Sequence, residues 1–333
     1  MENRTFKALV VSETEDKKYV RSLEEKRIAD LPDGEVLVQV EYSSLNYKDA
    51  LSASGNKGVT RNYPHTPGID AAGTVVDSRD GSFKPGDKVI VTSYDLGMNT
   101  AGGFGQYIRV PVGWVVPLPA GLSLGEAMSF GTAGFTAGLS VYQLTSHGIA
   151  PEDGEILVSG ATGGVGSISV AILKKIGFSV TAVNGIEDES EYLKEIGADR
   201  IISIEEATDQ SGRPMLKSCW AGSVDTVGGD ILATTIKSVL PNGVVTSCGN
   251  VASPNLPLTV FPFILRGVTL VGIDSQNCPM KHRLKIWELL AEDWKIPEIV
   301  KVVEEVSLSD LDRRIELMLK GGHRGRALVR VSD

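Results

Sequence analysis

A short apolar strand that leads directly into a glycine-rich turn constrains this chain most. Residues 155–159 read Glu-Ile-Leu-Val-Ser, residues 160–166 read Gly-Ala-Thr-Gly-Gly-Val-Gly, and a helical pattern covers residues 165–176. A turn with little side-chain bulk lets the first amides of the helix reach a diphosphate, whose negative charge the helix dipole favours. Compared with G-x-G-x-x-G, Ala161 takes the first position, whereas Gly163 and Gly166 are kept. An ordinary tight strand-to-helix turn would have the same pattern, so the rest of the chain must decide.

Strands and helices alternate through the second half of the chain. The predicted strands are residues 155–159, 179–183, 200–203, 224–227, 244–247 and 268–273, and the helices between them include residues 165–176, 188–196 and 231–240. This alternation predicts a doubly wound parallel sheet of the Rossmann type, with right-handed crossovers. It favours dinucleotide binding over a plain turn.

The first 120 residues have a different pattern, rich in strand and turn signals. Val36, Val38 and Val40 alternate with their neighbours after an Asp-Gly turn, and Pro-Gly-Asp precedes another strand. A chain of 333 residues has room for two domains. The pattern predicts an α/β protein with a β-rich domain, residues 1–122 and 296–333, and a Rossmann domain, residues 123–295.

The charge balance argues against some classes of partner. The net charge is −9, which disfavours binding to nucleic acid or to anionic membranes. No apolar stretch approaches the roughly 20 residues of a membrane-spanning helix, and the N-terminus has no signal-peptide pattern. The 3 cysteines are scattered and are expected to be reduced, as in a cytoplasmic protein.

Several local strings narrow the comparison to one family. The β-rich front domain followed by a Rossmann unit resembles the medium-chain dehydrogenase/reductase superfamily. Within it the chain resembles the zinc-free YhdH/YhfP group, which is quinone oxidoreductase-like and includes acrylyl-CoA reductases. The strings are SSLNYKDAL at 43–51, PGID at 67–70, GTAGFTA at 131–137, VDTVG at 224–228, PFILR at 262–266 and GIDS at 272–275. The resemblance implies a GroES-like catalytic domain, NADPH as cofactor and reduction of an activated C=C bond.

A zinc centre is not expected. Zinc alcohol dehydrogenases of the superfamily carry a Gly-His-Glu string where this chain has Gly68, Ile69 and Asp70. The cysteines form no C-x-x-C pair, and His65 is a lone histidine in that region. Because zinc needs three or four nitrogen or sulfur ligands, hydride transfer must depend on hydrogen-bond donors instead.

The end of the second Rossmann strand bears on the choice of cofactor. NAD enzymes place an acidic residue there, to bind the ribose 2′-hydroxyl. Here the strand ends in Asn184, Gly185 and Ile186, so no carboxylate at the strand tip repels a 2′-phosphate, which favours NADPH. The family commonly has Ser-Gly-Arg here, and its arginine clamps the phosphate, but Ile186 replaces it and Glu187 follows. Tyr192, Lys194 or Arg200 is a hypothetical replacement for the contact, although both cations could equally be solvated surface charges.

Further cofactor contacts follow from topology and from the resemblance. Ligands of doubly wound sheets bind at the carboxyl ends of the strands. The predicted cofactor-binding residues are Tyr47, Thr136, Thr162, Gly163, Gly164, Val165, Asn184, Gly185, Ile186, Asn250, Ile264, Ser275 and Arg326.

The predicted catalytic residues are Asn46 and Tyr47. In the family reaction, hydride reaches the β-carbon, negative charge develops on the carbonyl oxygen, and the α-carbon takes a proton. The amide of Asn46 and the phenol of Tyr47 could donate to that oxygen without carrying charge, and Tyr47 could also supply or orient the proton. Tyr94 and Asp70 are weaker candidates. The alternative for Asn46 and Tyr47 is a polar strand end with the tyrosine ring packed inside.

The sequence leaves the substrate open but predicts how the chain assembles. A CoA ester would need basic contacts, for which Lys48, Lys57, Arg61 and Arg324 are conceivable, whereas a quinone would need an apolar slot; the sequence does not choose. Residues 268–273 would form an exposed apolar sheet edge, which predicts a homodimer paired along that edge. The competing functions are a non-catalytic NADPH-binding protein, such as a redox sensor or a crystallin-like protein, and a zinc alcohol dehydrogenase.

Overall fold

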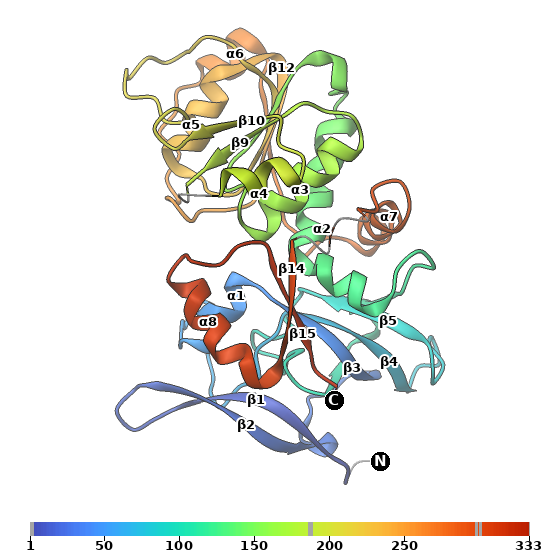
Figure 1. Cartoon of the computed structure of the whole chain (residues 1–333). Coiled ribbons are helices and arrows are strands. Elements are labelled where there is room, and N and C mark those ends of the chain that lie inside the picture. Colours follow the sequence, from blue (N-terminus) through green and yellow to red (C-terminus); the bar gives the residue numbers. More distant parts are fainter. Residues whose placement is uncertain (1–2, 186–188, 297–298, 300–301, 333) are drawn as a thin grey trace. The chain divides into compact units, whose positions relative to one another are not determined.

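A computed structural model describes residues 3–185, 189–296, 299 and 302–332. The chain divides into two compact units (Figure 1). Unit 1 comprises residues 1–132, 276–291 and 303–333, and unit 2 comprises residues 133–275 and 292–302.

Unit 2 is built on a parallel sheet. Its order is β10-β9-β8-β11-β12-β13, with every neighbouring pair parallel. The strands are β8 (Ile156–Val158), β9 (Val180–Asn184), β10 (Arg200–Ser203), β11 (Trp220–Asp225), β12 (Val239–Ser247) and β13 (Thr269–Gly272). The strand order reverses between β8 and β11, as in a doubly wound dinucleotide-binding sheet, which confirms the predicted fold.

Helices cover both faces of that sheet. The first face carries α3 (Gly164–Lys175) and α4 (Ser190–Glu195), and the other carries α5 (Gly229–Ser238) and α6 (Phe261–Arg266) (Figure 1). The connection from β10 to β11 contains no helix in residues 204–219, all of which the structure describes. Buried aliphatic residues such as Leu157, Ile236 and Val245 form the core between the layers.

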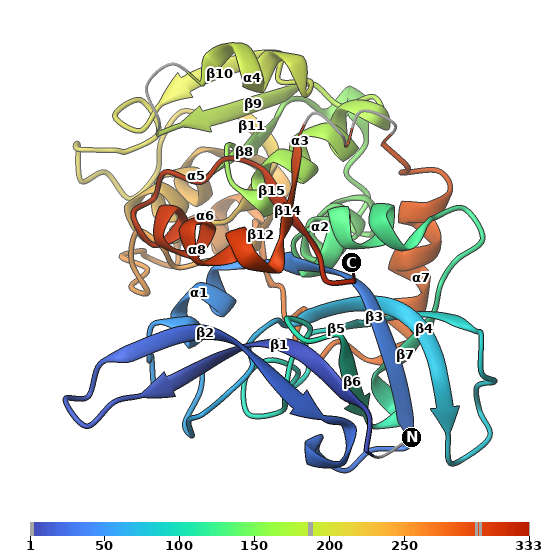
Figure 2. The same cartoon turned by 60° about the horizontal axis from the view of Figure 1, so that its bottom comes forward.

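Unit 1 is a curved, mainly antiparallel sheet with a separate hairpin (Figure 2). Its sheet runs β14-β15-β3-β4-β5-β7, and β6 also pairs with β3. The strands are β1 (Thr5–Glu13) and β2 (Tyr19–Arg27) of the hairpin, then β3 (Val36–Leu45), β4 (Asp70–Ser78), β5 (Lys88–Thr92), β6 (Tyr107–Val110), β7 (Val115–Pro117), β14 (Val303–Ser307) and β15 (Arg326–Arg330). Because β15 pairs with β3, the last strand of the chain returns to the first unit.

The helices of unit 1 lie around this sheet. They are α1 (Tyr47–Ala53), the start of α2 (Leu124–Ser146), α7 (Met280–Ala291) and α8 (Leu311–Leu319). Helix α2 continues into unit 2 and has a kink at Gly131, whose φ is 52°. The part of the chain that the structure describes also has short 3₁₀ turns, namely η1 (Ile28–Asp30), η2 (Val112–Trp114), η3 (Pro151–Asp153) and η5 (Leu308–Asp310).

Three segments differ from the predicted domain bounds: residues 123–132 and 276–291 belong to unit 1, and residues 296–302 belong to unit 2. The largest difference is residues 276–291, which were expected in the Rossmann domain. The reason is the buried side chain of Arg283 on α7, which donates to the carbonyl oxygen and the hydroxyl of Thr92 at 3.0 and 2.8 Å. Its guanidinium also lies 4.4 Å from the centre of the Tyr94 ring. These contacts tie the helix to the end of β5, whereas its sequence pattern looked like one more crossover helix.

Candidate functional site: a phosphate-binding turn and a buried polar network

The glycine turn has the geometry that a bound diphosphate requires. Gly163 is the N-cap of α3 and, as a glycine, offers no side-chain acceptor to the first amides of the helix. A Cβ on Gly166 would clash with the carbonyl oxygen of Gly160 and lie 2.7 Å from the Cα of Ala161. Gly160 itself has φ of 59°. The helix therefore starts close against the turn, and its glycine N-cap supplies no side chain to its first main-chain donors.

Hydrogen bonds from the neighbouring strand hold this turn in place. The Ser159 hydroxyl donates to Asp225 Oδ1 at 2.8 Å and accepts from the amide of Thr226 at 3.0 Å. Burial raises the pKa of Asp225, whereas its hydrogen bonds, that from Ser159 foremost, favour the ionised carboxylate. The turn is thus fixed to the end of β11, where the strand order reverses.

The carboxyl end of β9 is where the adenosine ribose is expected. Asn184 is half-buried and Gly185 is exposed, while Ile186 lies outside the described residues. Arg200 does not reach this end, because it pairs with Thr181 at the beginning of β9. Its guanidinium binds Glu155 at 2.7 Å and lies over the Trp220 ring. The hypothesis that Arg200 replaces the missing phosphate contact is therefore wrong.

Unit 1 contains a buried polar network at the junction of β3, β4 and α1. The Asn46 side-chain amide donates to Asp70 Oδ2 at 2.7 Å, and its carbonyl oxygen accepts from Arg326 at 3.1 Å. Ser44 Oγ donates to the same Asp70 oxygen at 2.6 Å and accepts from Arg326 at 2.7 Å. The Thr132 hydroxyl donates to the other Asp70 oxygen at 2.6 Å. One buried arginine therefore serves a cluster of acceptors around Asp70.

Asp49 is a second buried carboxylate in this network, and sequence reasoning missed it. Its oxygens accept from the backbone amides of Asn46 and Ile69, both at 2.8 Å, and of Gly68 at 3.2 Å. Burial and the nearby charge of Asp70 raise the pKa of Asp49 to about 7, against these donors, which favour the ionised form. The spacing Asn-x-x-Asp at the start of a helix could have revealed it, because a residue at this position reaches back to the N-cap amide.

The network also needs a glycine. A Cβ on Gly131 would clash with Ser44 Oγ and lie 2.6 Å from Asp70 Oδ2 and 2.7 Å from the Arg326 guanidinium. The kink in α2 therefore makes room for the packed polar groups.

The two predicted catalytic residues differ sharply in exposure. Asn46 is only 9% exposed, and its amide is occupied by Asp70, Asp49 and the Ser44 carbonyl. Tyr47 is 49% exposed. Arg326, predicted as a cofactor contact, is 2% exposed and donates to the network and to the carbonyls of Leu45 and Ser129. Of the two predicted catalytic residues, Tyr47 is therefore the exposed one, whereas Asn46 lies with Arg326 in the buried network.

Tyr94 is held in an unusual conformation. Ser93 and Tyr94 are consecutive non-glycine residues with φ of 64° and 50°. The Tyr94 ring stacks on Trp114, with centroids 5.5 Å apart, and the Arg283 guanidinium also lies over it. The Tyr94 hydroxyl donates to the Cys278 carbonyl oxygen at 3.4 Å. The Ser93 hydroxyl is 2.9 Å from that of Thr132, so this strained turn adjoins the Asp70 network.

The other predicted cofactor contacts lie in unit 2. Thr162 is buried in the turn, and Gly163, Gly164 and Val165 are half-buried at the start of α3. Three more follow strands or lie on a helix: Asn250 is exposed after β12, Ser275 is half-buried after β13, and Thr136 is buried in α2. Ile264 lies on α6 with 67% of its side chain exposed.

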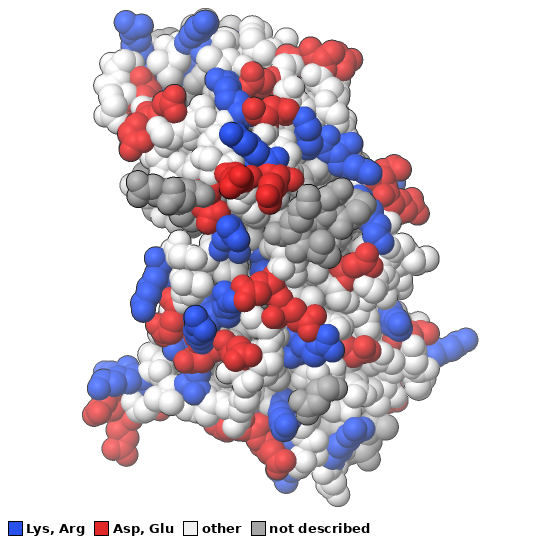
Figure 3. Space-filling view, viewed as in Figure 1, with Lys and Arg blue, Asp and Glu red and all other residues white. Residues whose placement is uncertain are grey.

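The basic residues considered for a CoA substrate are dispersed within unit 1. Lys48 donates to Gln276 at 2.6 Å, and Lys57 pairs with Glu13 at 2.8 Å. Arg61 and Arg324 are exposed. On the face seen in Figure 3, positive and negative side chains are interspersed.

The described side chains show neither a metal centre nor a membrane span. No three His, Cys, Asp or Glu side chains in the described part of the chain could hold a metal ion together. His65 is buried, and its Nε2 is 2.9 Å from the Gly97 carbonyl oxygen. No described helix has the length and apolar character to cross a bilayer.

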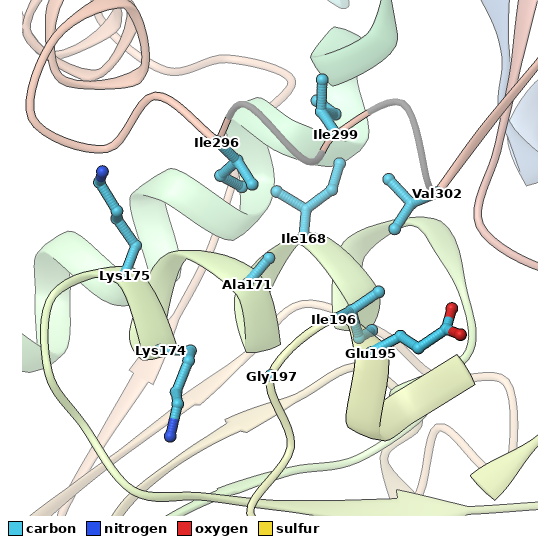
Figure 4. Close-up of a pocket in the computed structure, with 10 residues that line it drawn as sticks. All are labelled: Ile168, Ala171, Lys174, Lys175, Glu195, Ile196, Gly197, Ile296, Ile299 and Val302. Atoms are coloured by element: carbon cyan, nitrogen blue, oxygen red, sulfur yellow. The ribbon is translucent and has the colours of Figure 1, made fainter. Parts of the chain in front are cut away.

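A cavity of about 310 Å³ lies elsewhere in unit 2 (Figure 4). It is lined by Ile168 and Ala171 of α3, by Ile196, and by Ile296 and Ile299 among others. Lys174 at its rim pairs with Asp199 at 2.6 Å, next to the start of β9. The cavity therefore flanks the later turns of α3, away from the carboxyl ends of the strands.

Comparison with known proteins identifies relatives along the whole chain. Residues 32–120 match the alcohol dehydrogenase GroES-like domain, and residues 164–292 match the family described as zinc-binding dehydrogenase. The acrylyl-CoA reductase AcuI of Ruegeria pomeroyi is 44% identical, over 98% of this chain and 99% of its own. YhfP of Bacillus subtilis is 46% identical over 91% of this chain and 92% of its own.

Two solved structures have the same fold. The YhdH oxidoreductase of Salmonella enterica in complex with NADP has a TM-score of 0.95 and 42% identity, over 98% of this chain and 100% of that one. YhfP with NAD bound has a TM-score of 0.96 and 43% identity, with the same coverage.

Proposed function

Because the chain belongs to the YhdH/YhfP and AcuI group of the medium-chain dehydrogenase/reductase superfamily, we propose that it reduces an activated C=C bond with NADPH and without a metal. The substrate class is an acrylyl-CoA-type thioester or a quinone-like enone. The observation that carries the proposal is the strand–turn–helix of unit 2, whose helix has a glycine N-cap with no side chain to bind its first amides.

The residues of unit 2 fit a dinucleotide. Any side chain at Gly166 would push α3 away from the turn, and the turn itself offers main-chain donors for a diphosphate. Relatives with more than 40% identity were solved with NADP and with NAD. The proposed contacts are those named from the sequence in unit 2, namely Thr136, Thr162, Gly163, Gly164, Val165, Asn184, Gly185, Ile186, Asn250, Ile264 and Ser275.

When bound, the nicotinamide supplies a hydride for the β-carbon of the substrate. The protein must then stabilise the charge on the carbonyl oxygen and deliver a proton to the α-carbon. Tyr47 is the exposed uncharged donor next to the buried network, so we assign it to the carbonyl oxygen or to the proton. The side-chain amide of Asn46 is already used, because its nitrogen donates to Asp70 and its oxygen accepts from Arg326. We therefore propose that Asn46 fixes the main chain that precedes Tyr47. We therefore propose Arg326 as a positioning residue and not as a cofactor contact.

The proposed function is tested by following NADPH absorbance with acrylyl-CoA, crotonyl-CoA and a benzoquinone. Turnover of the first two identifies a thioester reductase, and turnover of the quinone alone identifies a quinone reductase. If the protein binds NADPH but turns over none of them, it is a binding protein, such as a redox sensor, and the proposal fails.

We also propose a homodimer, paired through the edge of the unit 2 sheet. β13 is the last strand of the sheet and is only half-buried. Nearby segments of unit 2 expose large apolar side chains, namely Val251, Leu256, Val260, Phe261, Ile264 and Leu265. Together with a free strand edge, such a surface favours pairing with a second copy. Light scattering should give twice 35.5 kDa, and a monomer would refute the dimer.

The proposed location is the cytoplasm. Cys219, Cys248 and Cys278 are all free thiols. Free thiols are typical of a reducing compartment.

A further inference from the structure

A cavity of about 560 Å³ lies in unit 2, beside the connection from β10 to β11. Doubly wound sheets usually carry a helix in such a connection, and its side chains cover the sheet. Here residues 204–219 form turns and irregular chain instead. The buried side chains of Leu157, Ala207 and Trp220 line the cavity, together with the half-buried Ile202 and Leu216. The space that a crossover helix would fill is therefore open, with mainly apolar walls.

Hydrogen bonds to α5 fix the connection in place, so the cavity is preformed. The Asp209 amide donates to Thr234 Oγ1 at 2.8 Å, and the Asp209 carboxylate binds Lys237 Nζ at 2.6 Å. Further along the connection, the Leu216 amide donates to the Lys237 carbonyl oxygen at 3.0 Å. Because two separate points of the connection are tied to one helix, a ligand would not have to order the loop before binding.

The ionised groups around the cavity balance one another. Asp209 lines the cavity and forms an ion pair with Lys237, and the two side chains are only 7% and 12% exposed. The other Asp209 oxygen accepts from the Ser211 hydroxyl at 2.6 Å. Among the exposed lining residues, Glu206 and Lys217 carry opposite charges. A charged ligand would therefore meet no excess of the opposite charge, whereas an uncharged ligand would leave the ion pair intact.

The cavity extends to the amino end of β11. Trp220 is the first residue of that strand, and the amide of Cys219 before it donates to the carbonyl oxygen of Ser238, the last residue of α5, at 2.7 Å. Thr235 and Ser238, in the last turn of α5, also line the cavity. A ligand seated against Trp220 would therefore lie away from the carboxyl ends of the strands, where a nucleotide binds.

We propose that this cavity binds an uncharged, mainly apolar organic molecule, at a site separate from that of the nucleotide. Its volume lies in the range of about 300–1,000 Å³ that is typical of small-molecule pockets. The apolar walls favour the ligand, and the closed ion pair disfavours an anion or a cation. This site would exist whether or not the chain reduces a C=C bond.

Protection of Cys219 tests the site in the wild-type protein. Cys219 lines the cavity and is exposed, whereas Cys248 is half-buried and Cys278 is buried. The probe is N-phenyl-1-naphthylamine, which is uncharged and fluoresces in apolar surroundings. At ten times its dissociation constant it should slow the reaction of Cys219 with a maleimide about tenfold, measured by peptide mass spectrometry. A probe that does not bind, or that leaves this rate unchanged, would overturn the proposal.

Competition tests the charge and the separation from the nucleotide. 2-Naphthamide should displace the probe about tenfold more effectively than 2-naphthoate, which has nearly the same shape but carries a charge. Equal displacement would show that the site does not select uncharged ligands. Saturating NADP⁺ should leave the probe bound, and displacement by NADP⁺ would place the probe in the nucleotide site and overturn the proposal.

Two substitutions locate the bound probe. Ala207→Phe fills part of the cavity and should weaken binding of the probe about tenfold. Leu265→Asp removes an exposed apolar side chain of unit 2 outside the cavity and should change the affinity less than twofold. Equal weakening by both would show that the probe binds exposed apolar surface and would overturn the site. Protection of Cys219 decides the question if Ala207→Phe does not fold.

Discussion

Replacing Arg326 with methionine should destabilise unit 1 far more than the same replacement of a surface arginine would. The guanidinium donates to Ser44 Oγ at 2.7 Å, to Asn46 Oδ1 at 3.1 Å and to the Leu45 carbonyl at 3.1 Å. It also lies 3.9 Å from Asp70 Oδ2. Methionine fills much of the volume but leaves these acceptors and the buried carboxylates without their cation. Removing one partner of a buried ion pair costs about 3–5 kcal/mol.

The loss should depend on pH. Burial and Asp70 already raise the pKa of Asp49 to about 7, and loss of the Arg326 charge raises it further. Protonation of Asp49 then relieves part of the uncompensated negative charge. The variant should therefore be closer to wild type at pH 6 than at pH 8.

Hydrogen exchange followed by mass spectrometry measures this loss locally. Peptides from β3 and β15 should exchange faster, by the equivalent of about 3–5 kcal/mol, whereas peptides from β8 and β11 serve as the internal control in unit 2. Arg326→Lys keeps the charge but not the planar fork of donors, so its loss of stability should lie between that of wild type and that of Arg326→Met. A change below about 1 kcal/mol, or an equal change in both units, would refute the positioning role of Arg326.

Three further substitutions test other parts of the site. Tyr47→Phe should lower kcat by about 10²–10⁴, the range for loss of a general acid, with unchanged stability; a loss below threefold would remove the phenol from the chemistry. Gly166→Ala should weaken the binding of NADPH and of NADH at least tenfold in titrations, because its Cβ meets the Gly160 carbonyl oxygen. Unchanged affinity would contradict the proposal that this turn binds the diphosphate. Because the pKa of Asp49 is raised to about 7 in the folded protein, ionisation of this carboxyl destabilises the fold. As the pH rises from 4 to 7, the free energy of unfolding of the wild type, measured in urea, should therefore fall by up to about 4 kcal/mol relative to Asp49→Asn. Parallel pH profiles of the two proteins would contradict this.

The sheet of unit 2 could be predicted because its strands are short apolar runs separated by turns and helical patterns. The ladder of β9 and β10 matches residues 179–183 and 200–203 within one residue at each end. The path of the crossover between β10 and β11 could not be predicted, because residues 204–219 have neither the periodicity of a helix nor that of a strand. Helix α7 was assigned to the wrong unit, because its place depends on the contact of Arg283 with Thr92, 191 positions earlier.

The local structure of the candidate site was predicted in part. The strand, glycine turn and helix are local features, so their sequence was sufficient to predict them, whereas phosphate binding there stays a prediction. The inward orientation of Asn46 was not visible, because it results from Asp70 and Arg326, which are distant in sequence. Asp49 was missed for a similar reason. One of its carboxylate oxygens accepts from the Gly68 and Ile69 amides, which belong to a loop that is distant in sequence.

The fate of the hydride tests the proposed reaction most directly. With acrylyl-CoA and NADPH that carries deuterium at both positions of nicotinamide C4, mass spectrometry and NMR should find one deuterium on the β-carbon of propionyl-CoA. With ordinary NADPH in D₂O, the deuterium should appear on the α-carbon instead. Bound NADPH without any propionyl-CoA, or deuterium from NADPH on the α-carbon, would contradict hydride transfer to an activated C=C bond.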